Sequence, residues 1–101
     1  MQIPTRAAIE DVLRIQRTEH SVFLRTTPLM RLPGAALGLA CREVRLKLEH
    51  LQVGGSFKAR GMLNRMLSNP IRQSGVIVAS GGNAGIATAA AAQHLGVNCE
   101  V

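Results

Sequence analysis

Residues 51–61 read LQVGGSFKARG and contain Lys58, one of two lysines in a chain whose other ten basic residues are arginines. A helical pattern follows this lysine. The N-terminal end of a helix disfavours a positive charge, and a lysine amine can lose its proton whereas a guanidinium does not. A neutral amine is a nucleophile. The position therefore indicates either a catalytic lysine or a surface lysine in a first helical turn.

Residues 80–85 read SGGNAG, between a predicted strand and a predicted helix. Amide groups of a glycine-rich turn at a helix N-terminus bind anions, and Ser80 and Asn83 add polar side chains. The glycines lack the spacing of a dinucleotide fingerprint, and in GGSFK the residue types of a phosphate-binding P-loop are missing. The turn predicts a carboxylate or phosphate site. The alternative is a tight turn with Asn83 as helix N-cap.

The elements before the lysine are predicted from local patterns. Thr5 is a candidate N-cap for an amphipathic helix over residues 5–17. Two prolines and a glycine in residues 25–34 indicate an extended connector. Strict alternation over residues 44–49 predicts a half-buried strand, with Lys47 on its polar face.

The elements around and after the lysine alternate between helix and strand: a helix capped by Ser56, a strand over 76–80, a helix over 86–95 and a strand over 97–101. The β-branched run 76–80 is typical of a strand buried on both faces. The alanine-rich helix is apolar on nearly all sides and should end at Gly96. This alternation predicts an α/β fold with a largely parallel sheet and right-handed crossovers.

Composition narrows the class of protein. The chain has 101 residues, a formal net charge of +6 and 2% aromatic residues. The arginines are scattered and aromatic stacking platforms are scarce, which disfavours nucleic-acid binding; no apolar run is long enough for a membrane helix. Cys41 and Cys99 are expected to be small buried hydrophobes rather than parts of a disulfide or metal site. The N-terminal residues do not resemble a signal peptide, so we expect a cytoplasmic protein without a metal site.

Three segments together resemble a known family. They are RTTPLMRL at 25–32, LKLEHLQVGGSFKARGMLNRM from residue 46, and GVIVASGGNAGIATAAAAQHLGV from residue 75. In this order and spacing they are similar to the fold-type II pyridoxal-phosphate enzymes, most of all to the serine/threonine dehydratase group. The resemblance covers roughly residues 5–101. It implies part of the tryptophan-synthase-β-like fold, a three-layer α/β arrangement with mostly parallel strands.

The resemblance also implies the site residues. Lys58 is similar to the lysine that forms the Schiff base with pyridoxal 5′-phosphate, Phe57 to the aromatic residue against the cofactor ring, and Asn83 to the asparagine that binds the ring hydroxyl. The loop implied to hold the substrate carboxylate consists of Ser80, Gly81, Gly82, Asn83 and Ala84.

The implied reaction is α,β-elimination, in which L-threonine or L-serine is deaminated to a 2-oxo acid and ammonia. The freed Lys58 amine would remove the Cα proton before the β-hydroxyl leaves. Gly81 replaces a second serine of the family pattern, which disfavours racemase activity, and Ala84 replaces a common histidine. Gly54 stands where the family usually has threonine. The alternatives are a β-replacement enzyme of the cysteine synthase or threonine synthase type, and a non-catalytic truncated chain.

The resemblance implies two partial domains. Residues 1–70 would be the N-terminal segment of the large cofactor domain, and residues 71–101 the beginning of the small domain, with the crossing near 69–75. The glycine-rich loop for the cofactor phosphate would lie beyond residue 101, so we expect the chain alone to be inactive. The expected partners are a small amino-acid substrate and, at full length, other copies of the same chain.

Overall fold

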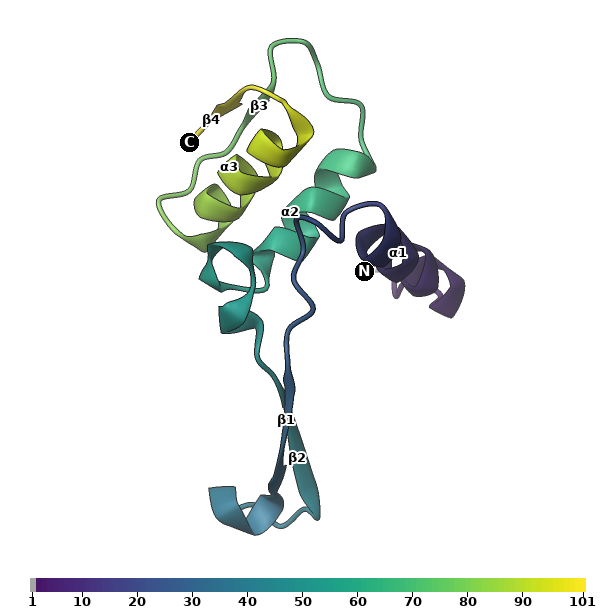
Figure 1. Cartoon of the computed structure of the whole chain (residues 1–101), viewed down its shortest axis with the longest axis vertical. Helices are drawn as coiled ribbons and strands as arrows, with labels where there is room; N and C mark the ends of the chain where they lie inside the picture. Colours follow the sequence, from purple (N-terminus) through teal and green to yellow (C-terminus); the bar gives the residue numbers. More distant parts are fainter. Residues whose placement is uncertain (1) are drawn as a thin grey trace.

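The computed structural model describes residues 2–101, and its elements alternate between helix and strand along the chain (Figure 1). In chain order they are α1 (Arg6–Thr18), β1 (Leu29–Pro33), the 3-10 turn η1 (Gly34–Leu37), β2 (Glu43–Lys47), the 3-10 turns η2 (Glu49–Leu51) and η3 (Val53–Gly55), α2 (Lys58–Leu67), β3 (Val76–Ile77), α3 (Asn83–Leu95) and β4 (Cys99–Glu100). The chain is therefore α/β, as its sequence pattern predicts.

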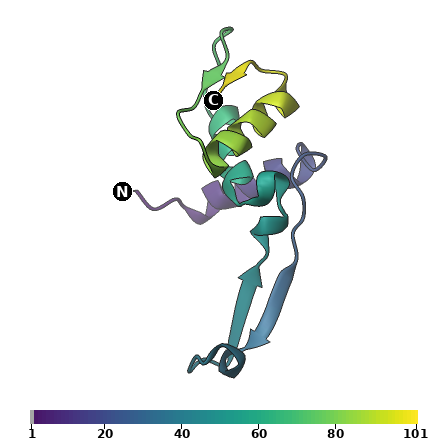
Figure 2. The same ribbon diagram turned by 90° about the vertical axis from the view of Figure 1, so that its left-hand side faces the viewer.

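β1 and β2 form an antiparallel hairpin that projects from the body of the molecule (Figures 1 and 2). The sequence predicts only an extended connector over 25–34. That prediction is wrong for residues 29–33, which are extended but pair with β2 in the register Met30 opposite Leu46 and Leu32 opposite Val44. These four apolar side chains share one face of the hairpin, because every second residue of a strand points to the same side. Met30 and Leu46 remain exposed there.

β3 and β4 are parallel and are connected through α3, which is the βαβ unit that the sequence predicts. α3 ends at Gly96, whose φ of 68° places it in the left-handed region favoured by glycine at a helix C-terminus. The sheet is smaller than expected, since the four strands form two separate pairs. Within residues 2–101 one pair is antiparallel and the other is parallel, so the single, largely parallel sheet stays a prediction.

The strand predicted over 76–80 to be buried on both faces is short and partly exposed. Regular pairing covers only Val76 and Ile77, and Ile77 is 78% exposed. The helix α3 packs against one side of the β3–β4 pair, and the other residues of 2–101 leave most of the Ile77 side chain uncovered. The β-branched run therefore correctly marks a strand, but the second covering layer is missing from the described residues.

The core lies where α2 packs against α3. Ala59 and Leu63 from α2 and Ala91 from α3 are completely buried, and Met66 and Leu24 close the cluster. Small alanine side chains allow the two helix backbones to approach closely. The sequence predicts that α3 is apolar on nearly all sides and contacts protein on more than one of them, yet Ile86 in its first turn is 53% exposed. The division of the chain near 69–75 stays a prediction, and residues on both sides of it contribute to this one core.

α1 begins as predicted, with the Thr5 hydroxyl accepting a hydrogen bond from the Ala8 amide at 3.2 Å. Little of the helix is covered, because Gln16 is its one buried residue and the apolar side chains of Ile9 and Leu13 stay exposed. The chain after α1 is held to the end of α3 by His20, whose Nδ1 lies 3.0 Å from His94 Nε2.

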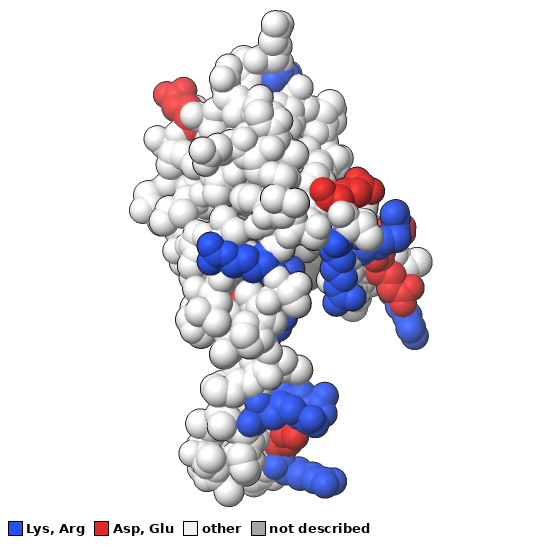
Figure 3. Space-filling model, viewed as in Figure 1, with Lys and Arg blue, Asp and Glu red and all other residues white. Residues whose placement is uncertain are grey.

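The molecule is extended for its length. Its radius of gyration is 16.2 Å and its dimensions are 52 × 32 × 30 Å, whereas a compact domain of this length has a radius near ~13 Å. The projecting hairpin accounts for the difference (Figure 2). Basic side chains gather along the hairpin and on the adjacent lower flank, while most of the upper body is uncharged in the view of Figure 3.

The two cysteines are less buried than the sequence leads us to expect. Cys41 is exposed and Cys99 is only partly covered, so the prediction that both are buried is wrong; Cys41 lies in the irregular turn of the hairpin, away from the core. Within residues 2–101, no helix combines the length and apolar character needed to cross a membrane, and no three His, Cys, Asp or Glu side chains are grouped to hold a metal ion.

Candidate active site

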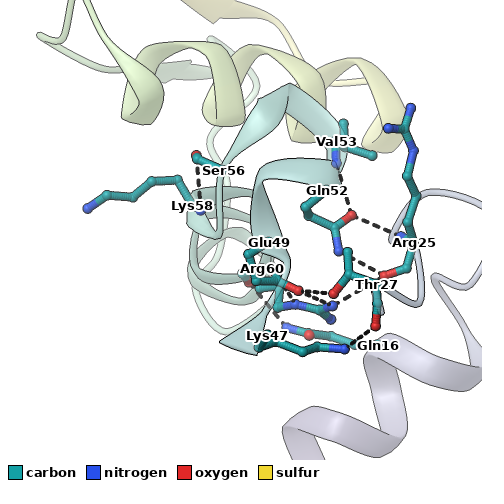
Figure 4. Close-up of polar contacts among 10 residues, drawn as sticks. All are labelled: Gln16, Arg25, Thr27, Lys47, Glu49, Gln52, Val53, Ser56, Lys58 and Arg60. Carbon is teal, nitrogen blue, oxygen red and sulfur yellow. Dashed lines mark hydrogen bonds and ion pairs between the residues drawn. The ribbon is translucent and has the colours of Figure 1, made fainter. Parts of the chain in front are cut away.

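Lys58 is the first residue of α2. The sequence predicts Ser56 as the helix N-cap, but Phe57 takes the cap position. The Ser56 hydroxyl still accepts a hydrogen bond from the Lys58 amide at 3.3 Å. The Lys58 Nζ atom lies 5.3 Å from the centre of the Phe57 ring, and its side chain extends away from the neighbouring polar network (Figure 4). The amine is therefore held at a helix start beside an exposed aromatic ring.

The turn before Lys58 depends on its glycines. Gly54 and Gly55 have φ values of 73° and 75°, in the region that side chains strongly disfavour. A Cβ atom on Gly54 would also lie 3.1 Å from Cγ2 of Ile86 in α3. A threonine at position 54, the usual residue of the family pattern, would thus be strained in this conformation. The same contact shows that the lysine segment runs directly past the first turns of α3.

The second motif, SGGNAG, forms the turn into α3 as predicted. The helix begins at Asn83 with Gly82 as its N-cap, so the alternative in which Asn83 is the cap is wrong. The Gly82 amide donates to the Ser80 hydroxyl at 3.3 Å. A Cβ atom on Gly81 or Gly82 would meet no other atom within 4 Å, so open space faces this turn. The turn and the lysine segment therefore both adjoin the N-terminal half of α3.

A buried glutamine anchors the lysine segment to the preceding chain. Gln52 is 1% exposed, and its Oε1 accepts hydrogen bonds from the Arg25 and Val53 amides at 2.9 and 3.0 Å. Its Nε2 donates to the Arg25 carbonyl oxygen at 2.8 Å. The side chain thereby replaces backbone pairing for Arg25, which lies 27 residues earlier in the chain.

An ion pair joins the same segment to α2. Arg60 donates from Nε to Oε2 of Glu49 at 2.8 Å and from Nη2 to Oε1 at 2.9 Å. Thr27 donates its hydroxyl hydrogen to the same carboxylate. The hydrogen bond from Arg60 is the main cause that lowers the pKa of Glu49; partial burial opposes it, and Thr27 and the positive charges of Arg60 and Lys47 add to it.

Two further contacts complete this polar network (Figure 4). Lys47 donates from Nζ to the carbonyl oxygen of Thr27, and Gln16 of α1 donates from Nε2 to the carbonyl oxygen of Arg60 at 3.2 Å. The interpretation of Lys47 as only a polar-face residue of its strand is therefore incomplete. The chain's two lysines differ in setting, since Lys47 belongs to the network and Lys58 extends away from it.

A cavity lies on the side of α2 that carries the polar network. Its volume is about 720 Å³, and its lining includes Arg25, Lys47, Arg60 and Phe57. Lys58 and the SGGNAG turn do not line it. Of the site residues that the sequence motifs predict, Phe57 lines this cavity, whereas Lys58 and the turn into α3 lie outside it.

Sequence reasoning missed the network because its partners are far apart in the chain. The hydrogen bonds link residues separated by 11, 22, 27 and 35 positions, beyond the reach of periodicity. Residue type does not single out Glu49, Gln52 and Arg60 either, because His50, Ser56 and Lys58 in the same stretch are also polar.

Comparison with known proteins gives a consistent result. The family described as "Pyridoxal-phosphate dependent enzyme" matches residues 21–101. An L-threonine ammonia-lyase from Thermotoga maritima is 38% identical over 91 residues, which cover 88% of this chain and 22% of that protein. A catabolic L-serine/threonine dehydratase from Saccharomyces cerevisiae is 40% identical over 90 residues, covering 80% of this chain and 24% of the relative.

A catabolic L-threonine dehydratase from Staphylococcus aureus is 36% identical over 81 residues, covering 78% of this chain and 23% of the relative. The chain thus spans about a quarter of the length of the curated relatives that it matches. No solved structure gives a significant match.

Proposed function

Because the chain belongs to the family of pyridoxal-phosphate dependent enzymes, we propose that it serves in the deamination of L-threonine or L-serine, with Lys58 as the amine that holds the cofactor. The relatives named as threonine or serine/threonine dehydratases support the reaction class. The location of Lys58 supports its role, since it begins α2 shortly after the Gly54–Gly55 turn, which passes Ile86 in the first turn of α3.

The residues around Lys58 fit pyridoxal phosphate. Phe57 is 63% exposed, which leaves its ring surface available to an aromatic ligand. The space in front of Gly81 and Gly82 is open. We propose that Lys58, Phe57 and Asn83 hold the cofactor. When bound, pyridoxal phosphate supplies an acceptor for the electron pair released at the Cα atom of the amino acid.

The chain's own residues would then act as follows. The turn formed by residues 80–84 binds the substrate carboxylate, because amides at the start of α3 and the helix dipole favour a negative charge. The Ser80 hydroxyl already accepts a hydrogen bond from Gly82 and shapes that turn. The Nζ atom of Lys58, once free and neutral, takes the Cα proton of the substrate.

Site-specific labelling tests the role of Lys58. The chain is incubated with pyridoxal phosphate, reduced with borohydride, digested, and mapped by mass spectrometry. We expect the label on Lys58 in preference to Lys47, because the Lys47 Nζ atom donates a hydrogen bond to the Thr27 carbonyl oxygen. The variant Lys58→Arg should lose this label while remaining folded. Equal labelling of both lysines, as in a chain denatured with guanidinium, would contradict the proposal.

A further inference from the structure

We propose that Glu49, Gln52 and Arg60 are positioning residues that close residues 49–60 into one fixed loop and thereby set the place of Lys58. The inference rests on the function proposed above for Lys58. It assigns to the polar network a task that is distinct from holding a ligand, since Figure 4 shows the Lys58 side chain directed away from all three residues.

The two ends of the loop are joined by an ion pair. Glu49 and Arg60 are 11 residues apart and form two parallel hydrogen bonds of 2.8 and 2.9 Å. The side chains are 16% and 29% exposed, so solvent only partly screens them. A bidentate contact between guanidinium and carboxylate fixes orientation as well as distance. Residue 60 is thereby held in place, and Lys58 lies two positions before it.

Gln52, within the loop, and Arg60, at its end, are both hydrogen-bonded to the backbone of Arg25. Gln52 binds both backbone polar groups of Arg25. Arg60 also donates from Nη2 to the Arg25 carbonyl oxygen at 3.2 Å. The backbone of Arg25 therefore fixes both Gln52 and Arg60. Residues 53–59 lie between these two fixed positions.

Within that span the backbone follows a defined path. Gly54 and Gly55 take left-handed conformations, and the Gly55 amide donates to the Gln52 carbonyl oxygen at 2.8 Å. The Ser56 hydroxyl then accepts from the Lys58 amide. Glycines make such a turn flexible, so the anchors at 52 and 60 add a constraint that these two local hydrogen bonds do not provide by themselves.

Hydrogen exchange of backbone amides tests the loop directly. Glu49→Gln and Arg60→Gln each break the ion pair. In both variants we expect the amides of residues 53–58 to exchange roughly tenfold faster, while those of α3 change little. The reason is that the loop can open locally without unfolding of the whole chain. Arg60→Lys keeps the charge but not the paired hydrogen bonds, so its effect should be intermediate. Matched controls are Glu43→Gln in β2 and Arg65→Gln in α2, both outside the loop.

Labelling of Lys58 by pyridoxal phosphate and borohydride supplies the second readout. The ratio of label on Lys58 to that on Lys47 should fall by about threefold or more in Glu49→Gln and Arg60→Gln, since small displacements strongly affect reacting groups. Leu63→Ala removes buried core volume while leaving the hydrogen bonds of Glu49, Gln52 and Arg60 in place. It should leave the ratio unchanged under conditions in which the chain is folded.

The outcomes separate the two proposals. If amides of residues 53–58 exchange at the wild-type rate in Glu49→Gln and Arg60→Gln, the positioning role is overturned. It is also overturned if Leu63→Ala speeds the exchange of these amides as much as the two loop variants do. A wild-type chain labelled equally on its two lysines overturns the proposed function of Lys58. In that case the exchange data still decide whether Glu49 and Arg60 close the loop.

Discussion

Gln52 shows how one polar side chain can substitute for secondary structure. It is almost completely buried and serves three backbone groups of Arg25 and Val53. Buried amide and carbonyl groups need such partners, because leaving them unpaired costs free energy. No buried side-chain nitrogen or oxygen lacks a hydrogen bond in the described part of the chain.

Replacing Gln52 should therefore be costly. Gln52→Ala leaves the Arg25 and Val53 groups without their partners, and we expect the free energy of unfolding to fall by about 2 kcal/mol. Urea denaturation followed by circular dichroism measures this change. Gln73→Ala is the matched control, since Gln73 is exposed in the loop before β3. Equal effects of both substitutions would contradict the anchoring role of Gln52.

Glu49 should make stability depend on acid pH. Its folded-state pKa is lowered from the ordinary value of 4.5, chiefly by the hydrogen bond from Arg60. A carboxylate with a lowered folded-state pKa stabilises the fold above its unfolded-state pKa, and this contribution is lost as the pH falls. The stability supplied by Glu49 is thus fully present above pH 4.5 and disappears as the pH drops below 4.5 through the folded-state pKa.

Comparing wild type with Glu49→Gln isolates this contribution. At pH 7 the free energy of unfolding of the variant should be roughly 1–3 kcal/mol lower than that of wild type, because Arg60 loses its charged partner. The difference should shrink as the pH falls below 4.5. Urea denaturation at several pH values measures it, and a difference that stays constant from pH 7 to pH 3 (about the range needed) would refute this account.

At the scale of the elements, two helical glycines should respond to alanine in opposite directions. Gly61 lies inside α2, and a Cβ atom there would meet no atom within 4 Å. At Gly85 in α3, a Cβ atom would collide with the Ser80 carbonyl oxygen and lie 2.8 Å from Val101 Cγ1. Gly85 is thus required for α3 to pack on the turn that precedes it.

Thermal and urea unfolding of both variants test this contrast. Gly61→Ala should raise the free energy of unfolding by about 0.5–1 kcal/mol, the usual helix preference for alanine. Gly85→Ala should lower it by about 1–3 kcal/mol, typical of overpacking. A stabilising Gly85→Ala would show that the Ser80 turn moves freely.

Local signals predict some of the element ends, although the cap of α2 is Phe57 and not Ser56, and non-local contacts decide the rest. The Thr5 cap and the Gly96 end of α3 depend on neighbouring residues, so the sequence alone revealed them. The pairing of β1 with β2 joins segments that no local pattern relates. The motifs around Lys58 and Asn83 were visible as residue types, but the anchors at Glu49, Gln52 and Arg60 appear only when the fold brings distant partners together.

At the scale of the whole molecule, stability should be uneven. The body has a shared core between α2 and α3, whereas the hairpin has two strands and an uncovered apolar face. Isolated two-stranded hairpins are only marginally stable. We expect amides of 29–33 and 43–47 to exchange faster by hydrogen exchange than those of α2 and α3. Equal protection of hairpin and helices would contradict this division.

The apolar face of the hairpin also links self-association to ionic strength. The face consists of Met30, Leu32, Val44 and Leu46, and the chain carries a net charge of +6. In dilute buffer, we expect repulsion between copies with this charge to keep the apolar faces apart. Dissolved salt shortens the range of that repulsion to about 10 Å at 0.1 M but leaves apolar attraction in place. The highest protein concentration at which the chain stays monodisperse should therefore fall as salt is added. Light scattering at increasing salt concentration measures this limit.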